Sequence, residues 1–149
     1  MSARIINGLE ELRSFQGQEV GASGWFLVTQ ALIDQFAEVS GDRQWIHVDV
    51  DRAASETEIG KTIAHGFLTV SLLSELSRQA VEVKGDYKMR INYGFNRLRF
   101  VSPVPAGSRI RARFTVKSVE DNQVTWLVTM DLEGSEKPAL VAEWLARFY

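Results

Sequence analysis

The sequence contains no cysteine and only two histidines in 149 residues. Without cysteine, the chain can form neither a disulfide framework nor a catalytic thiolate. It has three prolines and no Pro/Ser-rich stretch that could serve as a linker. We therefore expect one domain over residues 1–149, because this length suits a single domain and an apolar content of 45% is enough for one core.

Long hydrophobic runs are missing as well. No apolar run approaches the roughly 18 residues that would suggest a membrane span. The N-terminal segment, MSARIINGLEELRSF, lacks the hydrophobic stretch and cleavage site of a signal peptide. The formal net charge of −2 argues against a nucleic-acid-binding protein. We expect a cytoplasmic protein that binds neither nucleic acid nor membrane.

The basic residues are unevenly distributed along the chain. Between positions 88 and 119 there are eight of them and no acidic residue. Two interpretations remain open: solvated strand faces, where long basic side chains usually lie, or a surface that attracts a phosphate-bearing molecule. The eight residues are Lys88, Arg90, Arg97, Arg99, Arg109, Arg111, Arg113 and Lys117.

Hydrophobic periodicity predicts helices in the first half of the chain. One helix follows Thr29, a suitable N-cap, and ends at Ser40-Gly41, since glycine favours the left-handed turn that closes a helix. A short helix is expected from Asp51 to Glu58, capped by Asp51. The pattern predicts a long, nearly all-apolar and therefore buried helix from about His65 to Val83.

After Gly85 the apolar period changes to two, which predicts strands. Turn residues at Asp121-Asn122 and Gly134-Ser135 separate the last three runs. One apolar helix wrapped by a curved antiparallel sheet is an α+β arrangement. The alternating apolar positions begin at Met89, Ile110, Val124 and Ala142.

Both histidines lie in one stretch, from Phe36 to Leu73. Asp42 follows a Ser-Gly turn, and His47 lies five residues later. A carboxylate and an imidazole on one loop can together perform proton transfer, although Asp42 could also only bond its turn and His47 could be a core histidine. Gly66 opens the apolar helix, where free backbone N–H groups can bind an oxyanion. We interpret the neighbouring His65 as structural.

Two other chemistries receive less support. The spacing of four possible metal ligands is not that of a helix-borne pair, so we expect no metal; they are Asp42, His47, Asp49 and His65. No serine of the long helix lies in Gly-x-Ser-x-Gly, which disfavours a serine hydrolase. Of these serines, Ser74 is a candidate for lining an acyl pocket; the alternative is that its hydroxyl lies on the surface of the helix.

The segment 36–47, FAEVSGDRQWIH, resembles the signature of MaoC-like (R)-specific enoyl-CoA hydratases. That signature has an aromatic residue, a short apolar spacer, Ser/Thr-Gly-Asp, Asn-Pro, an aliphatic residue and histidine. Asp42 and His47 match its catalytic residues, and segment 63–66 looks like the helix start whose glycine amide serves as oxyanion hole. Segments 92–100 and 103–107 look like the NodN-like branch of this family and like single-domain hydratases of acyl-CoA metabolism. The chain departs from the family in having Gln44-Trp45 where Asn-Pro is usual.

This resemblance implies the hot-dog fold, which the order of helices and strands also suggests, and a homodimer with a shared sheet. It implies reversible (R)-specific hydration of trans-2-enoyl thioesters, carried by CoA or an acyl-carrier protein, with no cofactor beyond the thioester substrate. Alternatives are a hot-dog acyl-CoA thioesterase and a non-catalytic acyl-thioester-binding module. Candidate substrate contacts are Gln44, Ser74, Asn92, Tyr93, Arg97 and Arg99.

Overall fold

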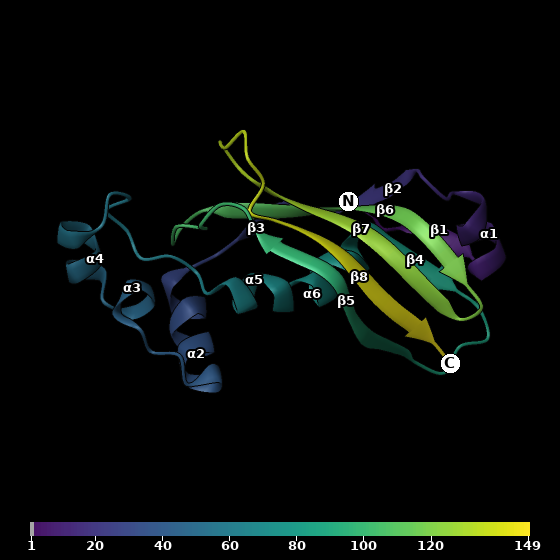
Figure 1. Cartoon of the computed structure of the whole chain (residues 1–149), viewed down its shortest axis with the longest axis horizontal. Coiled ribbons are helices and arrows are strands. Elements are labelled where there is room, and N and C mark those ends of the chain that lie inside the picture. The colour runs from purple at the N-terminus through teal and green to yellow at the C-terminus, as the bar shows by residue number, and fades with distance from the viewer. Residues whose placement is uncertain (1) are drawn as a thin grey trace.

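A computed structural model describes residues 2–149, and its largest feature is a curved antiparallel sheet (Figure 1). The strands follow the order β2-β6-β7-β8-β5, and the short β3 also pairs with β6. Below the sheet run α5 (Gly66–Ser71) and α6 (Leu73–Ala80). The expected α+β class is confirmed. The strands are β2 (Glu19–Ala22), β3 (Phe26–Leu27), β5 (Arg90–Phe100), β6 (Arg109–Glu120), β7 (Gln123–Leu132) and β8 (Leu140–Phe148).

The core lies between α6 and the inner face of β6, β7 and β8. Alternation along a strand sends every second side chain to one face, and the predicted apolar sets of these three strands are buried there. The ring of Phe114 lies near both Trp126 and Trp144, at centroid distances of 6.1 and 6.3 Å. Leu73 and Leu76 of α6 are buried in the same cluster.

The central helix is shorter than the sequence predicts. It breaks at Leu72 and ends at Ala80, whereas Val81–Lys84 forms β4, parallel to β1 (Arg4–Asn7). The expectation of one helix to Val83 was wrong because the alternating β-branched residues of VEVK favour a strand once β1 supplies backbone partners. The break follows two hydroxyls that bond carbonyls of α5, a contact that bends helices.

The strand β5 forms one edge of the sheet (Figure 1). The sequence predicts a strand here, and this is confirmed, but its apolar positions are not core. Ile91 is 44% exposed and Tyr93 54% exposed. Register shifts between Asn92 and Gly94, and between Phe95 and Arg97, bulge the strand and alter the direction of its side chains.

Three helices lie beyond the end of the sheet: α2 (Gln30–Ser40), α3 (Trp45–Val48) and α4 (Val50–Glu56) (Figure 1). As predicted, Thr29 caps α2 by accepting a hydrogen bond from the Leu32 N–H at 3.1 Å, and Gly41 ends it at φ 78°.

The prediction for α4 was wrong at its start. Asp49 caps this helix instead of Asp51, accepting from the Arg52 N–H at 3.0 Å. Asp49 lies just before the first helical residue, where its carboxylate reaches a free amide. A further helix, α1 (Leu9–Ser14), lies beside β1. Within residues 2–149 no helix is long and apolar enough to cross a membrane, and the cytoplasmic location stays a prediction.

Candidate active site

A cavity of about 440 Å³ opens where the helices α2 and α3 meet the start of α5 and the end of β5. It is mostly apolar with a few polar groups, the usual character of a small-molecule site. Three of the predicted residues lie in its wall: Asp42, His47 and Gly66. The other lining residues are Phe36, Ser40, Ile63, Ala64, His65, Phe67, Thr69, Phe100, Val101, Ser102, Pro103, Val104 and Ala139.

His47 is buried on the single turn of α3, and its ring has a defined tautomer. Nδ1 lies 2.6 Å from the backbone carbonyl of Ile63. A carbonyl can only accept, so Nδ1 carries the proton and Nε2 of the neutral ring is free to act as a base. The side-chain amide of Gln30 also donates to the His47 carbonyl at 2.8 Å. His47 is therefore held by hydrogen bonds to both its ring and its backbone.

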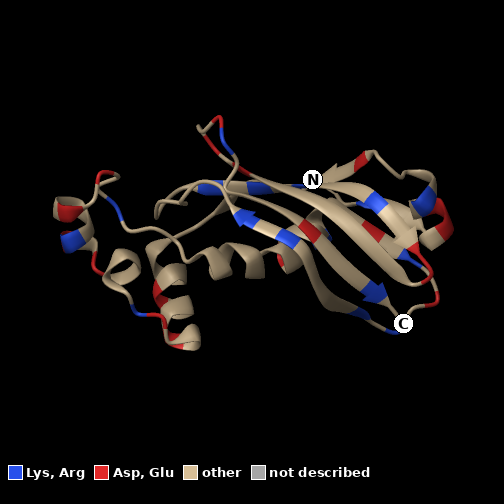
Figure 2. Cartoon of the chain, in the orientation of Figure 1, with Lys and Arg blue, Asp and Glu red and all other residues tan. Residues whose placement is uncertain are grey.

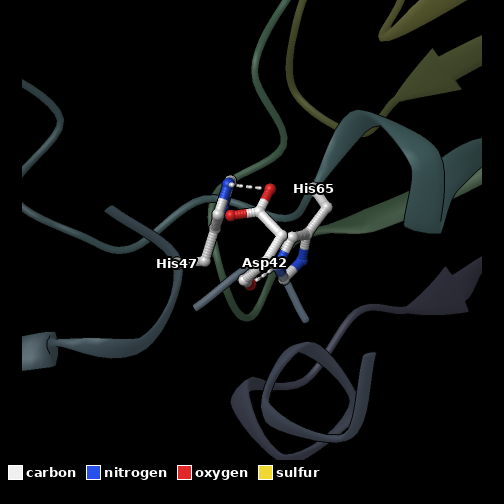
Figure 3. A group of neighbouring side chains, drawn as sticks. All are labelled: Asp42, His47 and His65. Atoms are coloured by element: carbon white, nitrogen blue, oxygen red, sulfur yellow. Dashed lines mark hydrogen bonds and ion pairs between the residues drawn. The ribbon is translucent and has the colours of Figure 1, made fainter. Parts of the chain in front are cut away.

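Asp42 presents its half-exposed carboxylate to this base (Figure 3). Its Oδ2 lies 3.9 Å from Nε2 of His47. This distance is too long for a direct hydrogen bond but allows one water to contact both groups. Ser40 Oγ accepts from the Asp42 N–H at 3.2 Å, and Oδ1 accepts from the Gln44 N–H at 3.3 Å.

His65 lies beside both residues, and ligand atoms of Asp42, His47 and His65 all lie within 4.8 Å of one another. Such a cluster suggests a metal site, but the ring geometry argues against one. The two imidazoles are stacked, with centroids 3.8 Å apart and planes 23° apart. Each nitrogen lone pair lies in its own ring plane, so stacked rings cannot both reach an ion at the roughly 2 Å that zinc requires.

Gly66 begins α5, as the sequence predicts. A Cβ at this position would lie 2.8 Å from the ring of Phe100, so a larger residue could fit only by displacing this half-exposed ring. The first amides of a helix have no partner inside it. Gly66 lines the cavity, so its N–H is a candidate donor to a ligand there, and this role stays a prediction.

The remaining predicted contacts do not line this cavity of the single chain. Gln44 precedes α3 and donates only its backbone N–H to Asp42. Ser74 is half-buried on α6. The other four, Asn92, Tyr93, Arg97 and Arg99, are exposed on β5.

Sequence reasoning missed several groups in the site. Ser40 had a local signal, since a serine two residues before Asp42 can bond its amide. Phe100, Ser102 and Ala139 had none, because only the fold brings β5 and the segments after it to this cavity.

Lys and Arg residues lie along the strands of the sheet (Figure 2), and some of those in the basic segment are paired with carboxylates. Arg111 and Arg113 lie 2.8 and 3.0 Å from the carboxylate of Asp131. Burial alone would raise the pKa of Asp131, but the hydrogen bonds from the two guanidinium groups hold it below its ordinary value. These two residues therefore form ion pairs between neighbouring strands of the sheet. Within residues 2–149, Arg97 and Arg99 form no ion pair.

Comparison with known proteins gives consistent matches. The MaoC like domain family model matches residues 12–137. The 3-hydroxyacyl-thioester dehydratase Z of Mycobacterium tuberculosis is 46% identical over 150 residues, covering 97% of this chain and 98% of that protein. Nodulation protein N of Rhizobium meliloti is 43% identical over 143 residues, covering 93% of this chain and 89% of that protein.

Solved structures are similar over most of their length. An R-hydratase of Pseudomonas aeruginosa in the unliganded form is 26% identical, with a TM-score of 0.76, covering 95% of this chain and 84% of that one. An (R)-hydratase from A. caviae involved in PHA biosynthesis is 27% identical, with a TM-score of 0.72, covering 90% of this chain and 99% of that one.

Proposed function

The chain belongs to the MaoC-like dehydratase family, with its hot-dog fold and hydro-lyase activity, and from this premise we propose that it catalyses (R)-specific hydration of trans-2-enoyl thioesters and the reverse dehydration. The predicted family, fold and enzyme class are thereby confirmed. The substrate, a thioester on CoA or an acyl-carrier protein, and the roles of individual residues are our proposals.

In the proposed reaction one water lies between the Asp42 carboxylate and Nε2 of His47. An O–H bond of this water breaks, its oxygen bonds the β-carbon of the enoyl group, and the pair accepts the proton. The pair also delivers a proton to the α-carbon, so the enzyme ends in its starting protonation state. General acid–base transfer of this kind needs groups within hydrogen-bond reach of the reacting atoms.

The electrons of the double bond move through the α-carbon towards the thioester oxygen, which gains negative charge. The Gly66 N–H at the start of α5 would donate to this oxygen. Backbone donors that are already oriented stabilise such charge without rearrangement, and the positive end of a helix dipole favours it. Neither a metal nor a covalent intermediate enters this scheme.

The observation that carries the proposal is the orientation of His47, whose free Nε2 faces Asp42 inside an apolar cavity. The test is to follow enoyl absorbance and free thiol together, with 2-enoyl-CoA substrates. We expect absorbance to fall without release of thiol. Release of thiol would favour a thioesterase, and absence of both changes would favour a binding module.

We also propose a homodimer that pairs through β5. This edge strand leaves backbone groups unpaired, and such edges are usually covered or paired. Changing Tyr93 and Phe95, which are 54% and 37% exposed, to lysine should yield monomers by light scattering at micromolar concentration. Leu127→Lys, at a 39% exposed residue of the inner strand β7, is the control and should remain dimeric. A wild-type protein that is only a compact monomer would contradict the proposal.

The unpaired arginines near the cavity are candidates for holding the phosphates of the carrier. Arg97 and Arg99 precede Phe100, which lines the cavity, by three residues and one residue. Reversing either charge to Glu should raise KM with little change in kcat, and added salt should reduce the difference, because exposed charges are screened. Arg4→Glu, an exposed position on β1, is the control. Unchanged KM in both variants would mean that Arg97 and Arg99 are solvated surface residues that do not bind the carrier.

A further inference from the structure

His65 connects the two groups of the proposed acid–base pair. Its Nε2 lies 2.8 Å from the backbone carbonyl of Asp42, and a carbonyl can only accept, so Nε2 carries a proton (Figure 3). Its ring stacks on that of His47, with a centroid distance of 3.8 Å. It also contacts the ring of Phe36, which is tilted relative to it, at a centroid distance of 5.0 Å. One side chain thus contacts Asp42 through a hydrogen bond and His47 through its ring.

The hydrogen bonds of Asp42 differ in reach. Those to Ser40 and Gln44 are local, spanning two residues each, whereas the bond from His65 spans 23 residues. Gly41, in the left-handed region at φ 78°, precedes Asp42, and no proline stiffens the loop that follows. The His65 bond therefore ties Asp42 itself to the start of α5, beside the bonds that join Ile46 and His47 to Ile63.

Packing alone does not explain a histidine at this position. The residue is 3% exposed, and its Nδ1 is buried without a hydrogen-bond partner in the described chain. A buried polar atom without a partner is unfavourable. A phenylalanine ring would fill similar space without this cost, but it would lack the donor for Asp42. The donor is what the histidine adds.

We propose that His65 is a positioning residue, which holds the Asp42 carboxylate and the His47 ring at the separation that one water can bridge. This inference rests on the proposed hydration and extends it to a third side chain. The face of the His65 ring also lies against the His47 ring, which becomes positively charged when it takes a proton, and ring faces stabilise cations. His65 touches neither water nor substrate in this scheme.

Two substitutions separate positioning from packing. His65→Phe keeps a ring of similar size but removes the donor, and it also removes the unpartnered Nδ1. We expect unchanged or higher Tm, little change in KM, and a kcat lowered by roughly tenfold to a hundredfold, the scale of a small misplacement of catalytic groups. His65→Gln places an amide donor near the position of Nε2 and should recover part of the lost kcat, although it removes the ring.

A fully active His65→Phe would overturn the positioning role. So would parallel losses of Tm and kcat that His65→Gln does not relieve, or failure of both variants to fold, because each result would assign the ring to packing. Asp42→Asn, measured beside them, distinguishes the two proposals. If the wild-type protein causes no loss of enoyl absorbance, the proposed function itself fails. A fully active Asp42→Asn refutes the acid–base role of Asp42, whereas an inactive Asp42→Asn beside an active His65→Phe refutes positioning alone.

Discussion

Replacing Asp42 with Asn, or His47 with Gln, is expected to lower kcat for hydration by about two to four orders of magnitude, the usual scale for general acid–base groups. Both substitutions keep the approximate shape of the side chain and remove the proton-transfer group. The measurement is the loss of enoyl absorbance under saturating substrate. Thermal unfolding should change less than activity, because the Asp42 side chain is half-exposed and Gln30 still holds the backbone of His47.

The double variant tests whether the two residues act as one unit. With 3.9 Å between Oδ2 and Nε2, both groups can contact the same water, so either single change affects the same step. The double variant should then be little worse than the worse single variant. Losses that multiply would instead indicate independent roles.

Glu38→Gln is a matched control, because it also converts a nearby carboxylate into an amide. Glu38 lies outside the cavity lining on α2 and pairs with Arg43, whose hydrogen bond lowers the pKa of the Glu38 carboxyl. An exposed ion pair contributes little to stability, so kcat and Tm should stay near the wild-type values. Near-native hydration by Asp42→Asn would contradict the mechanism and leave Asp42 with a structural role in its turn.

The second large effect is expected at Gly66. Gly66→Val should lower kcat about a hundred- to a thousandfold, as for loss of one oxyanion donor. The amide remains in the variant, but the new side chain displaces Phe100, whose ring would lie 2.8 Å from the added Cβ, and crowds the approach of the thioester oxygen. Phe100 is 49% exposed and can move outward, so the fold should survive.

A graded series identifies the cause of this loss. Gly66→Ala should lose less activity than Gly66→Val, and Gly66→Ala combined with Phe100→Leu should recover part of it, because the smaller residue makes room for the Cβ. Circular dichroism and thermal unfolding check that each variant is folded. Normal kcat in Gly66→Val would place the oxyanion hole elsewhere in the cavity.

Much of the fold was predictable because it depends on period and on local capping. The period of two in β6, β7 and β8 sends their apolar residues to one face whatever their partners are. Thr29 caps the start of α2 and Gly41 its end, both through contacts within a few residues. The catalytic candidates were also predictable, since Asp42 and His47 lie in one short segment whose pattern resembles a known signature.

Other features follow only from contacts between distant segments. The strand β4 forms because β1 lies beside it, so propensity along the chain did not locate the end of α6. Exposure of the apolar positions of β5 depends on its place at the sheet edge. Arg111 and Arg113 are not free to bind a ligand phosphate, because both form ion pairs with Asp131 on the neighbouring strand.

The site shows the same division. The sequence by itself determined which residues can transfer a proton, because that capacity belongs to their side chains. Only the tertiary structure decided which nitrogen of His47 is free to accept a proton, since the carbonyl that binds the other nitrogen belongs to Ile63, sixteen residues away. The structure also placed His65 in contact with Asp42 and His47, because these contacts form only when α5 begins beside their loop. Local pattern specifies chemical type, whereas hydrogen-bond partners across the fold specify protonation and orientation.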